Sequence, residues 1–410
     1  MGDEVTRVSD GAARAEDPSI APAVSAVQRW LVHHEGKRTH LPDFLEALAA
    51  RLSALGVPVF RVSLSLGDFH PEVVGRSYAW SRISGREEID RRYTPKASDV
   101  YLLSPVRLVH EGADAVRQRL DDPLSEPEFQ VMRELKAQGA TDYVGMALPF
   151  SDGARHFISF ATDAPGGFTT AHLSIIDALI PSMGLRIEIE HARRGSEQLL
   201  LNYLGQEAAR RVLAGAIRRN MGEAITAVIL ASDLRGFTQL ADTMPAETVI
   251  EALGHYFDAV AGPVRARGGD IVKMVGDGIL ALFPLTGFSP EADQARALDA
   301  LDAVREAAVA LEAIPSDALP EGIDALRAGF ALHVGPVTFG NVGSRERLDF
   351  TAIGLAVNEA FRLETLTKSL ASPIVTSASF AMLTGAEGLR SAGHHALRGV
   401  RAPKEVFVCA

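Results

Sequence analysis

The chain has 410 residues, of which 47% are hydrophobic and 23% are charged, so wholesale disorder is excluded and two or three domains are expected. Its net charge of −11 does not favour a nucleic acid or an anionic membrane as the main partner. The single cysteine, Cys409, excludes an internal disulfide framework and a multi-thiolate metal site. No apolar run is long enough to span a bilayer, and the start lacks a signal-peptide pattern. We therefore expect a cytoplasmic protein that binds no nucleic acid and has no membrane span.

The first 191 residues divide into a leader and a folded domain. Residues 1–22 are rich in Ala, Asp, Glu and Ser without an apolar period, which predicts a disordered leader. Residues 23–191 predict an α+β domain, with helices followed by strand-like runs and a closing apolar helix. The expected helices are 24–31, 41–55, 126–138 and 169–191, and the expected strands are 59–66, 73–80, 143–149 and 156–161.

The order of these elements resembles a GAF-like ligand-sensing domain. Three short runs carry the resemblance: LPFSDG at 148–153, FAT at 160–162 and GGF at 166–168. The resemblance implies a sensor or regulatory domain over residues 23–191 that receives a small-molecule or protein input, whose identity the sequence does not give.

Residues 192–221 predict an amphipathic connecting helix. Its apolar residues form one stripe, and the pairs Arg210-Arg211 and Arg218-Arg219 lie off it. The stripe comprises Leu200, Leu201, Leu204, Ala208, Val212, Leu213 and Ile217. Two interpretations remain open: a dimerising signalling helix, or a helix packed on its own neighbour.

An acidic residue ends the first strongly apolar strand of the remaining chain. Residues 225–232 are almost wholly apolar, which predicts a strand buried on both faces. The run DLRGFT (233–238) follows and places Asp233 before a glycine turn and a helix. Such a residue can hold a metal beside backbone N–H groups that face phosphate. The alternative is a plain helix N-cap.

A second acidic residue stands at the tip of a predicted hairpin. The strand-like runs DIVKMV (270–275) and ILALF (279–283) are joined by GDG, with Asp277 at its centre. If the hairpin lies beside the preceding strand, Asp233 and Asp277 converge. Two carboxylates there suit a pair of Mg²⁺ ions, which prefer oxygen ligands and are completed by water and phosphate.

A third group of residues lies farther along the chain. Gly335-Pro336 predicts another hairpin between strands at 329–334 and 338–341, and a further strand follows at 348–353. The next helix carries Asn358 and Arg362, which are four residues apart and share one face. An amide and a guanidinium on one face can stabilise a phosphoryl transition state. The alternative is an accidental surface pair.

Together these segments predict a ferredoxin-like βαββαβ core over residues 222–410. They resemble the catalytic domain of class III nucleotidyl cyclases. The motifs that carry the resemblance are DLRGFT (233–238), KMVGDG (273–278), GNVG (340–343), DFTAIG (349–354) and VNEAFRLE (357–364).

The resemblance implies a role for each matching residue. Asp233 and Asp277, with Leu234, match the metal site for two Mg²⁺ or Mn²⁺ ions. Lys273 matches the lysine that reads the adenine ring, and Thr351 matches its partner. The other substrate-binding positions are Gly236, Phe237 and Thr238.

Asn358 and Arg362 match the transition-state pair, which the opposite subunit of a homodimer supplies. The implied reaction is attack of the ATP ribose 3′-oxygen on the α-phosphorus, which gives 3′,5′-cyclic AMP and pyrophosphate. Guanylyl cyclases typically have an acid in place of Lys273, so this residue favours ATP.

One position departs from the family pattern, and one role of the family is left unassigned. Leu355 stands where many relatives have an acid. Arg398, Arg401 and Lys404 are candidates for a triphosphate-binding cation, and the spacing singles out none of them.

The sequence leaves three alternatives to an adenylate cyclase. A non-catalytic regulatory or scaffold module on the cyclase fold would usually have lost a metal acid or the arginine, and none is missing. A guanylate cyclase is the alternative in substrate. A diguanylate cyclase is suggested only by Gly268-Gly269-Asp270, which is followed by Ile-Val instead of an acid and Phe.

Overall fold

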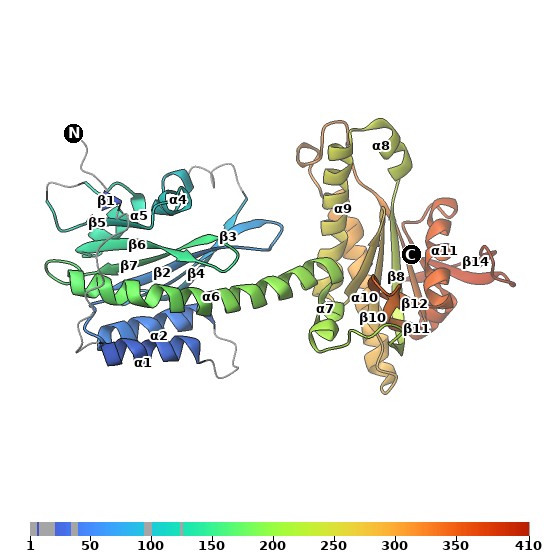
Figure 1. The fold of residues 1–410 in the computed structure, drawn as a ribbon. Coiled ribbons are helices and arrows are strands. Elements are labelled where there is room, and N and C mark those ends of the chain that lie inside the picture. The colour runs from blue at the N-terminus through green and yellow to red at the C-terminus, as the bar shows by residue number, and fades with distance from the viewer. Residues whose placement is uncertain (1–5, 8–20, 34–39, 94–100, 124–125, 410) are drawn as a thin grey trace. The chain divides into compact units, whose positions relative to one another are not determined.

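The computed structural model describes residues 6–7, 21–33, 40–93, 101–123 and 126–409. The chain divides into two compact units, residues 1–199 and 200–410 (Figure 1). Each unit contains its own sheet and its own hydrophobic core. The two units are therefore described in turn.

The first unit is built on one antiparallel sheet with the strand order β1-β5-β6-β7-β2-β3-β4. The strands are β1 (Thr6–Arg7), β2 (Arg61–Gly67), β3 (Val73–Ser81), β4 (Gly85–Arg92), β5 (Ala115–Arg119), β6 (Asp142–Pro149) and β7 (Arg155–Thr162). Within the predicted leader, Thr6–Arg7 pair with β5, and residues 21–22 open a helix. Residues 1–5 and 8–20 of the leader lie outside the described residues.

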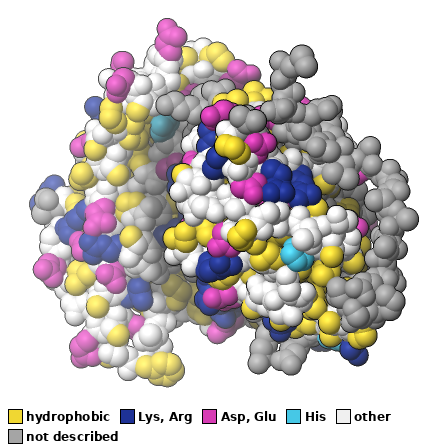
Figure 2. All heavy atoms as spheres, turned by 90° about the vertical axis from the view of Figure 1, so that its left-hand side faces the viewer, with side chains coloured by type: hydrophobic (Ala, Val, Ile, Leu, Met, Phe, Trp, Pro, Cys, Tyr) yellow, Lys and Arg dark blue, Asp and Glu magenta, His cyan; other side chains and the backbone are white. Residues whose placement is uncertain are grey.

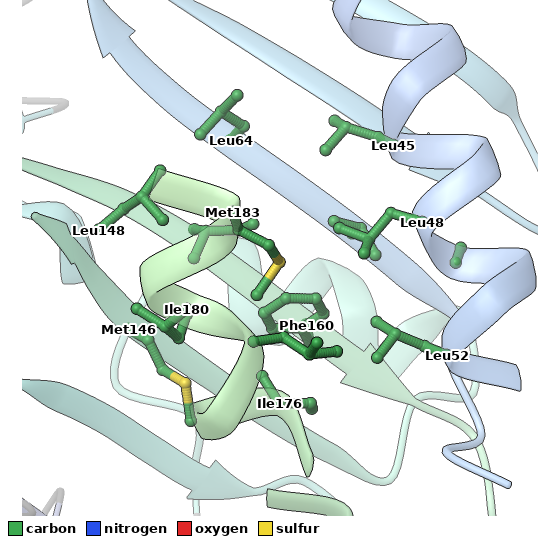
Figure 3. Packing of buried hydrophobic residues seen from close by; sticks show 14 of the residues in the cluster. Leu45, Leu48, Leu52, Leu64, Met146, Leu148, Phe160, Ile176, Ile180 and Met183 are labelled. Atoms are coloured by element: carbon green, nitrogen blue, oxygen red, sulfur yellow. The ribbon is translucent and has the colours of Figure 1, made fainter. Parts of the chain in front are cut away.

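Helices cover both faces of this sheet (Figure 1). On one face lie α1 (Ala21–Val32), α2 (Leu41–Ala54) and the long α6 (Thr170–Leu204), and on the other lie α4 (Pro105–His110) and α5 (Gln130–Ala137). Figure 3 shows Leu45, Leu48 and Leu52 of α2 packed with Ile180 and Met183 of α6. The helical spacing of these apolar residues places them on the core side.

The predicted connecting helix over 192–221 is not one helix. α6 ends at Leu204, α7 spans Gln206–Leu213, and residues 214–221 are not helical. Gly205 separates the helices with φ of 81°, and a Cβ there would lie 2.7 Å from the Ile271 carbonyl oxygen. Three stripe residues, Leu204, Ala208 and Val212, pack into the core of the second unit. For these residues the structure supports the second interpretation, a helix packed on its neighbour.

The second unit is built on an eight-stranded sheet with the order β14-β15-β13-β11-β8-β10-β9, and β12 pairs with β11. Its strands are β8 (Gly222–Leu234), β9 (Asp270–Val275), β10 (Gly278–Pro284), β11 (Ala328–Gly343), β12 (Leu348–Ile353), β13 (Ile374–Ser377), β14 (Leu389–His395) and β15 (Lys404–Cys409). β8 pairs antiparallel with both β10 and β11. Val228 and Leu230 face one core, and Ile229 faces the other. The prediction of a strand buried on both faces is confirmed.

The helices of this unit form a layer on each side of the sheet (Figure 1). α9 (Ala246–Ala266), α10 (Pro290–Glu312) and α12 (Ala378–Leu383) pack on one face. α7 and α11 (Leu355–Ser369) pack on the other. The short α8 (Phe237–Thr243) follows the end of β8, and a 3₁₀ turn lies at Ser316–Ala318.

One predicted hairpin is confirmed and the other is wrong. Residues 276–277 form the two-residue turn between β9 and β10. Gly335-Pro336, however, lies inside the continuous β11, and the turn comes at 344–347. The Pro336 carbonyl points to the β12 side, because a Cβ on Gly354 would lie 3.2 Å from it. The Pro336 nitrogen, which carries no hydrogen, faces the same side as this carbonyl and lies beyond the end of β12. The proline therefore removes no hydrogen bond between β11 and β8.

Candidate active site

Asp233 and Asp277 meet where β8 ends. Gly278, the residue after Asp277, pairs in register with Asp233 across the β8–β10 ladder. The Leu234 N–H donates to the Asp277 carbonyl oxygen at 3.1 Å, which holds the hairpin tip against the strand end. The predicted convergence of the two carboxylates is confirmed.

Burial and neighbouring acidic residues disfavour the ionised form of Asp233. Burial, followed by the charges of Asp277 and Glu364, raises the pKa of Asp233 to about 6. Burial also raises the pKa of Glu364. A cation between Asp233 and Asp277 would relieve this repulsion, and two carboxylates are the donor type that Mg²⁺ or Mn²⁺ takes. Across the described residues, no three or more His, Cys, Asp or Glu side chains form a ready metal cluster. Further ligands would therefore come from water, phosphate or a backbone carbonyl such as that of Leu234.

A buried polar network lies behind the acids. The Arg235 guanidinium lies 3.6 Å from Glu364 Oε1 and donates to Thr367 Oγ1. Thr367 Oγ1 also lies 3.2 Å from Glu364 Oε1. A Cβ on Gly329 would come within 2.6 Å of all three side chains, so a larger residue there would displace the network. The network fixes α11 to the end of β8. Sequence reasoning missed it, although Arg235 and Glu364 both stand inside the quoted motifs.

The predicted phosphate-facing turn follows Asp233 directly. Gly236 has a φ of 76° and precedes Phe237, the first residue of α8. Gly236 and Thr238 are exposed, and Phe237 is half-buried. The left-handed glycine turns the chain two residues beyond the end of β8 and three residues after the acid.

Lys273 has a partner that sequence reasoning missed. Its ammonium forms an ion pair with Asp349 of β12. Thr351, the predicted partner, lies two residues farther along β12 and therefore on the same face of that strand. The structure thus brings Lys273 to β12, the strand that carries Thr351. It also adds the Asp349 carboxylate to the predicted pair of Lys273 and Thr351. The DFTAIG motif contains Asp349, so the sequence did carry a signal for this partner of Lys273.

Asn358 and Arg362 line an open pocket of about 480 Å³. The remaining lining residues are Phe361, Thr365, Leu366, Ala396, Leu397 and Arg398. The structure therefore singles out Arg398 among the three candidate C-terminal cations. Gly399 brings its turn close to Arg362, because a Cβ there would lie 3.3 Å from a guanidinium nitrogen.

Asn358 and Arg362 lie on a different face of α11 from Glu364. Glu364 points toward the acids, since its charge acts on Asp233. Arg362 is two residues earlier, so it projects about 200° around the helix from Glu364. The pocket lined by Asn358 and Arg362 contains neither Asp233 nor Asp277. The two groups of candidate residues therefore lie in separate places on one chain.

Comparisons with known proteins found matches to the second unit. Residues 221–408 match the family model for the adenylate and guanylate cyclase catalytic domain. An uncharacterised protein of Mycobacterium tuberculosis is 32% identical over 176 residues, which are 42% of this chain and 31% of that protein. Adenylate cyclase 1 of Rhizobium meliloti is 32% identical over 146 residues, 36% of this chain and 21% of that protein. This chain thus spans less than a third of either relative.

A solved structure of a guanylyl cyclase is also similar. It is 30% identical, with a TM-score of 0.40, and the match covers 46% of this chain and 93% of that one. Proteins named for adenylate and for guanylate chemistry thus both stand among the relatives.

Replacing Asp233 by Asn should stabilise the protein at neutral pH. The folded pKa of about 6 lies above the ordinary 3.8, so folding disfavours the ionised carboxyl. The gain should be absent below about pH 4, grow between about pH 4 and 6, and level off at about 1–2 kcal/mol, discounted for partial exposure. Urea unfolding of the second unit over a pH series measures it.

Asp242→Asn, at an exposed position on α8, is the matched control and should change little at any pH. Equal stability of Asp233→Asn and the parent above pH 6 would contradict the proposed repulsion.

Proposed function

We propose that this chain, whose residues 221–408 are a catalytic domain of the adenylate and guanylate cyclase family, converts ATP to 3′,5′-cyclic AMP and pyrophosphate. The observation that carries the proposal is the meeting of Asp233 and Asp277 at the end of β8. Paired carboxylates at that position suit metal-assisted chemistry on a triphosphate. The intact Asn358 and Arg362 disfavour the scaffold alternative.

In the proposed reaction the ribose 3′-oxygen bonds to the α-phosphorus, the bond to the β-phosphate bridging oxygen breaks, and the 3′-hydroxyl proton passes to solvent. Asp233 and Asp277 would hold two Mg²⁺ or Mn²⁺ ions, which when bound acidify the 3′-hydroxyl and neutralise the triphosphate. Arg362 and Asn358 would stabilise charge on the α-phosphoryl group, and Arg398 of the same pocket would pair with the phosphate chain. Positioning and charge are sufficient for this chemistry.

We further propose that two chains share each site. Asp233 and Asp277 lie at one partial site, while Asn358 and Arg362 face a pocket on another side of α11. A homodimer in which the pocket of one chain meets the acids of the other would assemble two complete sites. This arrangement accounts for a transition-state pair that points away from the acids of its own chain.

We assign the choice between adenine and guanine to residues of β9 and β12. The Lys273 ammonium is a hydrogen-bond donor, which suits adenine N1, an acceptor, better than guanine N1–H, a donor. Asp349, two residues before Thr351 on β12, forms an ion pair with this ammonium and would keep it from rotating freely. This donor arrangement favours ATP over GTP, and a guanylate cyclase remains the alternative.

The first unit would act as a GAF-like regulatory domain in intracellular signalling, with an unidentified small molecule or protein as its input. Its single antiparallel sheet covered by helices supports this role. Among the described residues, acidic and basic side chains intermingle on the face shown in Figure 2. Among the helices that the structure describes, none has both the length and the apolar character needed to cross a bilayer.

Purified protein should produce cyclic AMP from ATP with Mn²⁺ or Mg²⁺, and at least about tenfold less cyclic GMP from GTP, since one mismatched donor at the base costs on the order of 1.4 kcal/mol. Chromatography of both products after incubation with each nucleotide measures this. Higher activity on GTP than on ATP would contradict the assignment of ATP as the substrate. A protein that binds ATP without forming a cyclic nucleotide would support the scaffold alternative.

Asp277→Ala and Arg362→Ala should each be inactive alone and should recover activity when mixed. A heterodimer of the two variants contains one complete site, so an equal mixture should reach about a quarter of the parent activity, given random exchange of subunits. Two affinity tags allow the heterodimer to be isolated and assayed. No recovery in a proven heterodimer would rule out shared sites.

A further inference from the structure

Asn341, in the GNVG motif, is a buried polar residue that the proposed mechanism does not use. It lies on β11 and is only 5% exposed. Its side-chain Nδ2 donates to the carbonyl oxygen of Ala216 at 2.7 Å and to that of Arg218 at 3.3 Å. Both acceptors belong to residues 214–221, the non-helical stretch between α7 and β8 that is here called the linker segment. The Asn341 side chain therefore holds the linker segment against β11.

The backbone of Asn341 continues this contact. Its N–H donates to the Met221 carbonyl oxygen at 2.9 Å, and its carbonyl oxygen accepts from the Asn220 N–H at 3.2 Å. A Cβ on Gly340 would lie 2.3 Å from the Met221 carbonyl oxygen, so the glycine of the motif permits this close approach. Asn341 thus meets the linker segment with its side-chain amide and with both of its backbone polar groups.

The linker segment takes the place of β8 beside the end of β11. The ladder between β8 and β11 ends at Gly340, so Asn341 is the first residue of β11 beyond that ladder. On the other side of β11, Asn341 pairs with Phe350 of β12, which stands between Asp349 and Thr351. The part of the β11–β12 pair that carries Asp349 therefore extends past β8, and Asn341 fixes it to the linker segment.

This contact is important because Asp349 reaches a strand that is not its neighbour. β12 pairs with β11, β9 pairs with β10, and among the described strands no ladder joins β9 to β12. The ion pair of Lys273 with Asp349 spans these two strands. Its geometry therefore depends on what holds the end of each strand, and for β12 this includes the hydrogen bonds between Asn341 and the linker segment.

A second set of contacts joins α7 to the same part of the sheet. The Arg211 guanidinium lies over the Phe339 ring, 5.1 Å from its centre, and pairs with Glu223 at 2.9 Å. Phe339 in turn packs edge-on against Phe350, with ring centres 4.9 Å apart. The helix that precedes the linker segment is thus itself fixed to the sheet, so Asn341 binds a segment whose position is defined.

We infer that Asn341 is a positioning residue for the choice between adenine and guanine. It acts through β12, because its hydrogen bonds to the linker segment keep Asp349 within reach of Lys273. The inference deepens the proposed function and rests on it, since it takes Lys273 and Thr351 to contact the base. Without the side-chain hydrogen bonds of Asn341 the end of β12 could shift. An ammonium that Asp349 no longer holds would then distinguish less well between an acceptor and a donor on the base.

Nucleotide binding to the full chain tests this role. The dissociation constants of 3′-deoxy-ATP and 3′-deoxy-GTP, which cannot cyclise, are measured by calorimetry in the presence of Mn²⁺. In Asn341→Ala the ratio of the two constants should come at least about fivefold closer to one than in the parent, as is typical for the loss of buried side-chain hydrogen bonds. Asn341→Ser keeps one donor on a shorter side chain, so it should shift the ratio in the same direction, and it replaces the alanine variant if that variant does not fold.

Thr384→Val is the matched control for the loss of buried hydrogen bonds. Thr384 is 1% exposed at the end of α12, and its hydroxyl lies within hydrogen-bond distance of the carbonyl oxygens of Phe380 and Ala381. Neither β12 nor the linker segment takes part in these contacts. The control should lower the stability measured by urea unfolding, and it should leave the ratio of the two dissociation constants unchanged.

Binding is measured without turnover, so a chain that forms no cyclic nucleotide can still confirm the role of Asn341, and an active cyclase can still refute it. If the parent preferred 3′-deoxy-GTP, the assignment of ATP would fail, whereas a ratio that moved toward one in the Asn341 variants would still support the inference. An unchanged ratio in a folded Asn341 variant, or an equal shift in Thr384→Val, would overturn it. A parent that binds neither nucleotide, or binds both equally, would also overturn it.

Discussion

The antiparallel pairing of β10 with β8 is the constraint on which the catalytic unit depends. It places the hairpin tip at 276–277 against the end of the central strand and thereby forces Asp233 and Asp277 together. The ionised form of Asp233 is disfavoured there, because burial and the neighbouring acids raise its pKa to about 6. A cation bound between Asp233 and Asp277 would relieve this repulsion.

Helix α11 connects the acids to the remaining candidate residues. Its buried side joins Glu364 and Thr367 to Arg235 behind the acids. A different side presents Asn358 and Arg362 to the pocket that Arg398 shares. The same helix thus packs behind the two acids and carries Asn358 and Arg362, so its position on the sheet sets both groups of candidate residues. This geometry is the physical basis for proposing that complete sites form between two chains.

Local patterns predicted the central features of this unit. The apolar run at 225–232 and the GDG turn placed both acids correctly, because strand burial and a two-residue turn are encoded by neighbouring residues. The GAF-like assignment and the roles of the site residues remain predictions. Gly335-Pro336 misled the prediction, because a proline within a strand is tolerated only where a neighbouring strand ends, and that depends on tertiary pairing. The ion pair of Lys273 with Asp349 joins residues 76 positions apart, a distance over which no local pattern operates. The break at Gly205 likewise depends on the Ile271 carbonyl of another strand.

Direct measurement of Mn²⁺ binding tests the central claim, that Asp233 and Asp277 recruit the cation. Free Mn²⁺ is followed by electron paramagnetic resonance at about pH 7.5 in the presence of 3′-deoxy-ATP, which cannot cyclise. The parent protein should bind Mn²⁺, and Asp277→Asn should bind it at least about tenfold more weakly, as expected on removal of a carboxylate ligand. Asp242→Asn should bind as the parent does. Unchanged Mn²⁺ binding by Asp277→Asn would contradict the account.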